Sequence, residues 1–142
     1  MENDALALNQ TFEFNFNLAE PDGDYLYFNP NVFTTFRDNP FFSETRVSDI
    51  DLGWLNSYFI RGSYKIPSTY KVNVLPKSVT LFMPDKSIVF KRTIGEQDGN
   101  VAIQYSIDFK RALFSKEEYP LIREFYKKMY EMLNEQIVLK KI

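Results

Sequence analysis

Carboxylates lie close together in two short segments of this sequence, and such clusters can bind metal ions or act as general acids and bases. In the first segment three of them alternate around Gly23, an arrangement that can supply oxygen ligands to Ca²⁺. These residues are Glu20, Asp22 and Asp24. The spacing is not that of an EF-hand loop and no bidentate glutamate follows where one is required, so we interpret residues 19–24 as an Asp/Gly turn.

The second segment contains Asp49 and Asp51. Two carboxylic acids that flank one glycosidic bond are what glycoside hydrolysis requires, and the pair could equally hold a cation. No cleft around them can be identified from the pattern, so a solvated loop is the preferred interpretation. We therefore predict no catalytic residue, no metal site and no cofactor.

The composition removes most other catalytic chemistry, because the 142 residues include no Cys and no His. Without Cys there is no disulfide, no thiolate nucleophile and no Cys-ligated zinc or iron–sulfur site. Without His there is no Ser-His-Asp triad and no imidazole ligand. We therefore predict that the chain is not an enzyme, and an enzyme built on carboxylates is the least favoured alternative.

Aromatic residues are abundant, with 14 Phe, 9 Tyr and 1 Trp. Exposed rings on a β-sandwich could stack on sugars, which gives an alternative function: a module that recognises a glycan or a peptide through surface aromatics. The tyrosines considered for such a platform are Tyr25, Tyr27, Tyr58, Tyr64 and Tyr70. Because Phe and Tyr are also favoured in strands and fill cores, we expect most of the rings to pack internally.

Charge is distributed unevenly along the chain: residues 1–60 carry a net charge of −8 and residues 61–142 carry +6. The basic residues of the second half are scattered among acids, so we predict no nucleic-acid partner. No segment approaches roughly 18 continuous apolar residues, so we predict no membrane insertion. The first ten residues lack the regions of a signal peptide, which fits either a cytosolic protein or a piece of a longer secreted chain.

The elements that position these residues are mainly strands. Alternation over residues 11–18 predicts a half-buried strand with Phe12, Phe14, Phe16 and Leu18 facing the core. Further strands are predicted at 25–28, 32–36, 55–66, 70–75, 78–83, 87–94 and 101–109, with residues 37–53 as an irregular connection. Strands at this spacing favour a mainly β fold, an antiparallel β-sandwich of about seven to nine strands over residues 11–111, after a flexible lead-in at 1–10.

The period changes to that of a helix near the end of the chain. Ser115 and Glu118 have the spacing of a capping box, and an apolar stripe then recurs every three or four residues. The stripe consists of Ile122, Phe125, Tyr126, Met129 and Leu133. We expect a C-terminal amphipathic segment at 115–135 that packs on the sandwich, with the helix itself starting near Pro120. The tail at 136–142 either continues the helix or forms a strand. We expect a single domain over 1–142.

Three segments, at 39–53, 70–85 and 114–142, have an order and spacing that resemble a known bacterial domain. The corresponding elements are Asn39-Pro40-Phe41, Arg46, Val47 to Gly53, Leu75-Pro76, Tyr119 to Met132 and Val138-Leu139-Lys140. From about Phe12 to Ile142 the chain resembles the C-terminal domain of unknown function that follows the transglutaminase-like core in bacterial transglutaminase-like proteins. Val47-Ser48-Asp49 departs from the family pattern, which more often has a Pro before its Asp.

The resemblance implies a non-catalytic accessory domain that packs against or orients the transglutaminase-like core of the same parent chain. That core would use a Cys-His-Asp arrangement, which this sequence cannot supply. The parent would be exported from a Gram-negative cell, to the periplasm or outside. The candidate residues, read as either a structural corner or a contact surface for the core, are Asn39, Pro40, Phe41, Arg46, Asp49 and Asp51. As a corner, Phe41 anchors the loop and Arg46 pairs with one of the two aspartates.

Overall fold

The computed structural model describes residues 10–13, 15 and 17–142. Within them ten strands form antiparallel pairs and one α-helix, α1 (Tyr119–Leu133), lies near the C-terminus. The strands are β1 (Glu20–Asp22), β2 (Tyr25–Phe28), β3 (Ile50–Asp51), β4 (Ser57–Lys65), β5 (Tyr70–Val74), β6 (Val79–Phe82), β7 (Ile88–Gln97), β8 (Asn100–Phe109), β9 (Leu113–Phe114) and β10 (Ile137–Lys141). Two 3-10 turns, η1 (Pro30–Phe33) and η2 (Lys116–Glu118), complete the described elements.

The strands form two four-stranded sheets, in the orders β4-β8-β7-β6 and β1-β2-β10-β5, and a small β3-β9 pair. The long β7–β8 hairpin is the centre of the first sheet, and its tight turn is made by Asp98 and Gly99, which both have positive φ. Alternation along β8 places one set of side chains on a single face, and all of that set is buried. The set is Val101, Ile103, Tyr105, Ile107 and Phe109.

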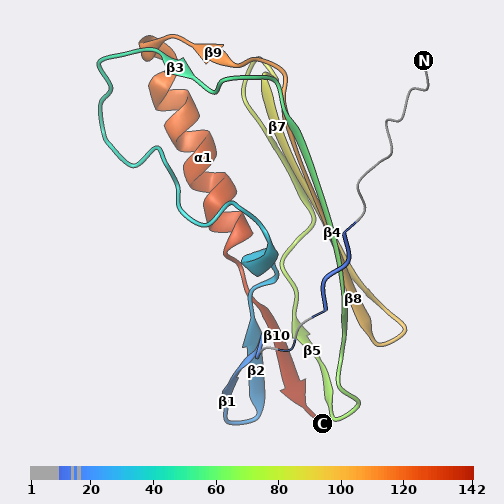
Figure 1. The fold of residues 1–142 in the computed structure, drawn as a ribbon. Helices are drawn as coiled ribbons and strands as arrows, with labels where there is room; N and C mark the ends of the chain where they lie inside the picture. The colour runs from blue at the N-terminus through green and yellow to red at the C-terminus, as the bar shows by residue number, and fades with distance from the viewer. Residues whose placement is uncertain (1–9, 14, 16) are drawn as a thin grey trace, which may run out of the picture.

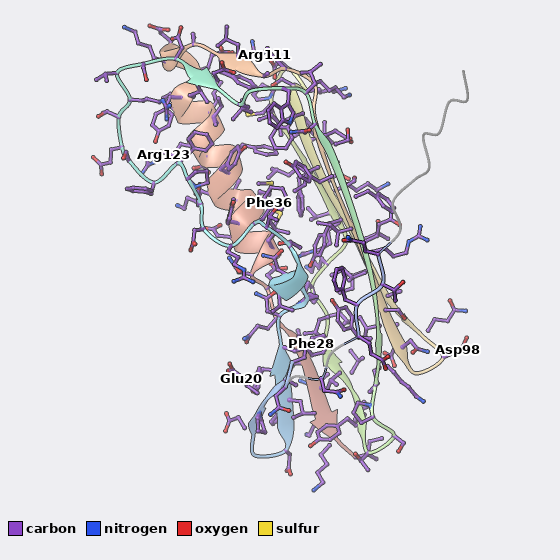
Figure 2. The ribbon with its side chains drawn as sticks, viewed as in Figure 1. Glu20, Phe28, Phe36, Asp98, Arg111 and Arg123 are labelled. Atoms are coloured by element: carbon purple, nitrogen blue, oxygen red, sulfur yellow. The ribbon has the colours of Figure 1, made fainter. Side chains whose placement is uncertain are left out.

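Two elements cover this apolar face of the long sheet. Figure 1 shows α1 lying over one end of it and the β1-β2-β10-β5 sheet beside the other end. The first hydrophobic cluster joins the helix stripe predicted from the sequence to β7 and β8. The second cluster joins Phe28, Ile66, Val101, Ile137 and Leu139, so the two sheets pack on each other there (Figures 1 and 2). The expected mainly β fold, with antiparallel sheets and one packed C-terminal helix, is confirmed.

The C-terminal segment contributes to both clusters. The chain turns into η2 after Ser115, whose backbone N–H donates to Glu118 Oε2 at 2.9 Å. α1 then ends at Leu133, two residues before the predicted boundary, and residues Ile137–Lys141 form β10. Because β10 pairs with β2 on one side and β5 on the other, the tail is a central strand of its sheet.

The predicted strand over residues 11–18 is wrong for the residues that the structure describes. None of residues 10–13, 15 and 17–19 lies in a strand, and Phe12 is 75% exposed. Phe14 and Phe16 lie outside the described residues. α1 and the second sheet cover the apolar face of the long sheet, and of the described residues in this segment only Leu18 and Ala19 pack against the second cluster.

The predicted strand at 32–36 is also wrong, because residues 30–33 form η1. Pro30 at the first position has the φ that a helical turn requires, and the Asn29 side chain accepts from the Asn31 N–H at 2.8 Å. The predicted strands between 55 and 109 are confirmed as β4 to β8. In the described part of the chain no helix combines the length and the apolar character needed to cross a membrane.

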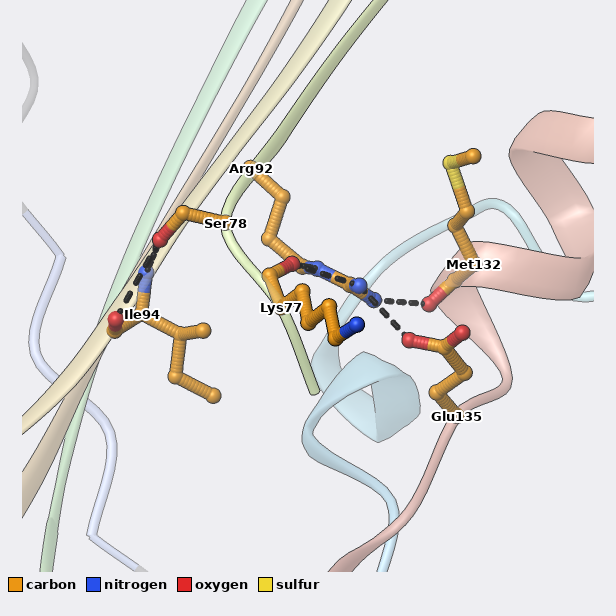
Figure 3. A network of polar contacts seen from close by, with 6 residues as sticks. All are labelled: Lys77, Ser78, Arg92, Ile94, Met132 and Glu135. Carbon is orange, nitrogen blue, oxygen red and sulfur yellow. Dashed lines mark hydrogen bonds and ion pairs between the residues drawn. The ribbon is translucent and has the colours of Figure 1, made fainter. Parts of the chain in front are cut away.

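A buried arginine joins the end of α1 to the long sheet (Figure 3). Arg92 on β7 is 2% exposed. Its Nε and Nη2 donate to the Lys77 carbonyl at 2.9 and 2.7 Å, Nη2 also donates to Glu135 Oε2 at 2.6 Å, and Nη1 donates to the Met132 carbonyl. A cation at this position interacts favourably with the helix C-terminus and adds a charged donor to the Met132 carbonyl, which also accepts from the Glu135 N–H at 3.4 Å. The guanidinium therefore links β7, the β5–β6 connection and the C-terminus of α1.

A second arginine holds the other end of the helix. Arg111 makes an ion pair with Asp85 at 3.3 Å and another with Glu118, and its guanidinium lies 4.2 Å from the centre of the Phe114 ring. The Arg111 hydrogen bond lowers the pKa of Glu118, and the Ser115 amide lowers it further. These contacts connect the β6–β7 turn to the start of α1.

We expect Arg92→Ala to lower the free energy of unfolding by about 2–4 kcal/mol, because the Lys77 carbonyl loses both of its guanidinium donors and the Met132 carbonyl loses its charged one. Urea unfolding followed by circular dichroism measures the loss. The matched control is Lys91→Ala, an exposed cation on the same strand, which should stay within about 0.5 kcal/mol of the unmodified protein. A loss below about 1 kcal/mol for Arg92→Ala would show that the link contributes little.

Candidate functional site

A cavity of about 240 Å³, which we call the aromatic pocket, is the candidate site. It lies where the 34–56 connection passes beside α1 and meets the start of β4, and Figure 2 labels Phe36 on this stretch. The rings that line it are Phe36, Trp54, Tyr58, Phe109, Tyr126 and Tyr130. Thr35, Pro40, Leu52 and Asn56 complete the lining. The pocket thus combines segments that are far apart in the sequence.

Ring-to-ring contacts fix the walls of the aromatic pocket. Tyr58 packs edge-on against Phe36, with ring centres 5.1 Å apart, and against Phe109, with centres 6.2 Å apart. Tyr126 and Tyr130, one turn apart on α1, are stacked with centres 6.2 Å apart. Edge-to-face and offset-stacked pairs of this kind are favourable beyond the area that they bury. Trp54 differs from the others, because its side chain is 71% exposed.

The hydroxyls of Tyr126 and Tyr130 make no hydrogen bond to any protein group that the structure describes, although the two residues are only 6% and 9% exposed. Tyr119 behaves differently: its hydroxyl donates to the Ser43 carbonyl at 2.7 Å. Among the described residues, the only buried side-chain polar atom without a partner is Arg111 Nε. Both hydroxyls are therefore accessible to solvent, and both residues line the aromatic pocket.

The side chains that line the aromatic pocket are neutral. Burial raises the pKa of Tyr126 and of Tyr130, neighbouring phenol groups raise the pKa of Tyr126 further, and the charge of the Asp38 carboxylate raises the pKa of Tyr130 further. Both phenols consequently stay protonated at neutral pH and can donate as well as accept hydrogen bonds. None of the lining side chains carries a charge or forms a nucleophile–base pair, so this arrangement is suited to binding and not to acyl or phosphoryl transfer. No cluster of three metal-ligating side chains occurs among the described residues.

Of the Asn39-Pro40-Phe41 motif, Pro40 lines the aromatic pocket. The Phe41 N–H donates to Asn39 Oδ1 at 2.9 Å, which closes a tight turn around Pro40. Phe41 itself is buried behind the pocket and packs edge-on against Tyr126, with ring centres 4.5 Å apart. Phe41 therefore holds the 34–56 connection to α1.

The other three predicted residues do not reach the pocket. Arg46 Nε donates to the Ser48 carbonyl at 3.1 Å, and within the described residues it makes no ion pair with Asp49 or Asp51, so the predicted pairing is not formed. Asp49 Oδ1 instead accepts from the Lys116 N–H at 2.9 Å. Asp51 Oδ1 accepts from the N–H of Gly53, whose φ of 86° only glycine adopts easily. Both aspartates therefore stabilise the backbone conformation of this part of the chain by accepting hydrogen bonds from backbone N–H groups.

The tyrosines considered as a sugar platform do not share one surface. Only Tyr58 lines the aromatic pocket. Tyr64 packs between the two clusters and its hydroxyl donates to the Pro30 carbonyl at 3.2 Å. Tyr25 and Tyr27 lie on β2, and Tyr70 begins β5, so these three belong to the second sheet.

The first carboxylate cluster lies in the β1–β2 hairpin, where the turn is limited to residues 23–24 and is therefore shorter than the predicted 19–24. Glu20 and Asp22 belong to β1, and Gly23 adopts a φ of 58° in the tight turn that follows.

Sequence reasoning missed most of the aromatic pocket. Trp54, Asn56 and Phe36 were not singled out, and Tyr126 was recognised only as part of the apolar helix stripe. The available signal was the single Trp of the chain, placed in a turn-rich connection where no core position is expected.

A second hollow, of about 470 Å³, opens between the end of β4 and the β2–β10 pair. Leu18, Leu26, Phe28 and Leu139 line it, and all of them belong to the second hydrophobic cluster. Tyr64 also lines this hollow, but its hydroxyl already donates to the Pro30 carbonyl. This hollow is the open side of the core.

Comparison with protein families finds one described as a domain of unknown function with a solved structure (DUF3858), whose model matches residues 24–139. Among solved structures, a crystal structure of a "putative protease" from Parabacteroides distasonis has a similar fold, with a TM-score of 0.59 and 14% sequence identity. The match covers 69% of this chain and 19% of that chain. Comparison with curated proteins gives no match.

We expect Phe41→Ala to cost about 3–5 kcal/mol of unfolding free energy, because it leaves a cavity between the connection and α1. Its neighbour Phe42 is 78% exposed, so Phe42→Ala should change the stability by less than about 0.5 kcal/mol. Guanidinium unfolding curves of the two variants make the comparison. Equal effects for the two would contradict the role of Phe41 as an anchor.

Proposed function

The chain belongs to the DUF3858 family, and on this premise we propose that it is a non-catalytic accessory domain of a longer transglutaminase-like protein, packing against or orienting the catalytic core. The observation that carries the proposal is the coverage: the similar fold in the Parabacteroides distasonis protein takes up 19% of that chain. A domain of this kind is therefore found as a small part of a larger protein.

The chemistry of the sequence supports a non-catalytic role. A Cys-His-Asp site needs two residue types that are absent from the chain, and the aromatic pocket offers no nucleophile–base pair in their place. Catalysis in the parent protein is then assigned to another part of it. We propose in addition that residues 1–142 are a single domain and that the parent is exported to the periplasm or beyond, as the resemblance to exported transglutaminase-like proteins implies.

We propose that the contact with the core uses the outer stretch of the connection, residues 42–48. Phe42 is 78% exposed and Val47 is 93% exposed. In Figure 1 the connection before β3 runs outward, away from α1. The stretch is fixed at both ends, by buried Phe41 and by the bond from Lys116 to Asp49. Exposed apolar side chains on an anchored loop are suited to docking, because little conformational freedom remains to be lost. Arg46, on the same stretch, supplies a charge at the rim.

The test uses the full parent chain and a variant of this stretch. We expect Val47→Asp to lower the unfolding temperature of the core by several degrees in calorimetry, because a carboxylate is then placed in an apolar contact. The unfolding of residues 1–142 alone should stay unchanged, since Val47 makes no buried contact within them. The matched control is Ile142→Asp, which changes another exposed aliphatic residue far from the loop.

Two outcomes separate the parts of this proposal. If removing residues 1–142 leaves the stability and activity of the core unchanged, the accessory role is wrong. If removal destabilises the core but Val47→Asp does not, the role stands and the contact lies on another surface.

A further inference from the structure

The size of the aromatic pocket limits what it can hold. At about 240 Å³ it is smaller than the roughly 300–1,000 Å³ of pockets for drug-sized ligands. A nucleotide or a flavin does not fit, whereas one six-membered ring with its substituents does. A charged ligand would find no opposite charge among the side chains that line the pocket.

The polar groups of the pocket both donate and accept hydrogen bonds. Tyr126 and Tyr130 present hydroxyls that have no partner among the described residues, and Asn56 adds an amide with both functions. Both hydroxyls are accessible to solvent, so water satisfies them when no ligand is bound. A ligand that carries several hydroxyls can replace this water without losing hydrogen bonds.

The rim supplies an aromatic face. Trp54 lines the pocket yet is 71% exposed, although a large apolar side chain gains stability from burial. Its ring can cover the C–H face of a saturated ring seated in the pocket, while the tyrosine hydroxyls meet the polar edge of that ring. A pyranose ring has both features, an apolar C–H face and a polar edge of hydroxyls.

We propose that the aromatic pocket binds one neutral pyranose ring of a glycan, with Trp54 stacking on its C–H face and Tyr126, Tyr130 and Asn56 bonding its hydroxyls. This binding activity is separate from the accessory role proposed above. The observations favour a sugar over a proline-rich peptide in two ways. Peptide carbonyls only accept, so the acceptor capacity of the tyrosines would go unused. Proline-rich ligands also bind in an extended groove lined by aromatic residues. The neighbouring cavity next to Asn39, into which such a ligand would have to continue, is instead lined by the charged residues Arg123, Glu124 and Lys127.

The single Trp makes the test direct, since the fluorescence of Trp54 reports on the pocket and on nothing else in the chain. A glycan array first selects the tightest neutral saccharide, and titration of that saccharide into residues 1–142 then gives a dissociation constant. We expect saturable binding that Tyr130→Phe and Asn56→Ala each weaken by about tenfold, as the loss of one hydrogen bond implies. Tyr130→Phe keeps the stacked ring, and circular dichroism verifies that the fold is retained.

The matched control is Tyr25→Phe, which removes a hydroxyl on β2 and should leave the affinity unchanged. Three results would overturn the proposal: no neutral saccharide on the array binds, the affinity is unaffected by both pocket variants, or an octaproline peptide changes the Trp54 fluorescence while saccharides do not. The last result would make the pocket a peptide site.

Discussion

The packing of α1 against one face of the β4-β8-β7-β6 sheet is the interaction on which the rest of the structure depends. That face carries an unbroken apolar row along β8, and a sheet with one apolar face must bury it against another layer. α1 covers one end of this face. After α1 the chain continues into β10, a central strand of the β1-β2-β10-β5 sheet, which covers the other end. Arg92 lies where the two coverings meet and bonds the last turn of the helix. Closure of both clusters therefore depends on the C-terminal residues.

The aromatic pocket is a consequence of the same packing. Tyr126 and Tyr130 belong to the first hydrophobic cluster and also line the cavity. The 34–56 connection can approach only because Phe41 is seated against Tyr126. Stability and the candidate binding function thus use the same residues, and a change that loosens Phe41 should open the pocket as well.

Much of the fold could be predicted from the sequence because the signals are local. The alternation over 101–109 and the stripe from Ile122 to Leu133 each report one face of one element, and both are confirmed. The same kind of alternation gave a wrong prediction at residues 11–18, since a two-residue hydrophobic period does not show whether a neighbouring strand or layer is available for pairing. The pocket and the Arg92 link were missed because they join residues that lie far apart in the sequence, such as Thr35 and Tyr130 in the pocket, and no local pattern records which distant residues meet.

If α1 and the long sheet form one cooperative unit, native-state hydrogen exchange of their backbone amides is the most direct test. The amides in the middle of α1, around Phe125 and Met129, should exchange with the same opening free energy as those of Ile103 and Tyr105 on β8, and that value should equal the global free energy of unfolding. Exchange of the helix at a clearly lower free energy, with β8 still protected, would contradict the dependence of the sheet on α1.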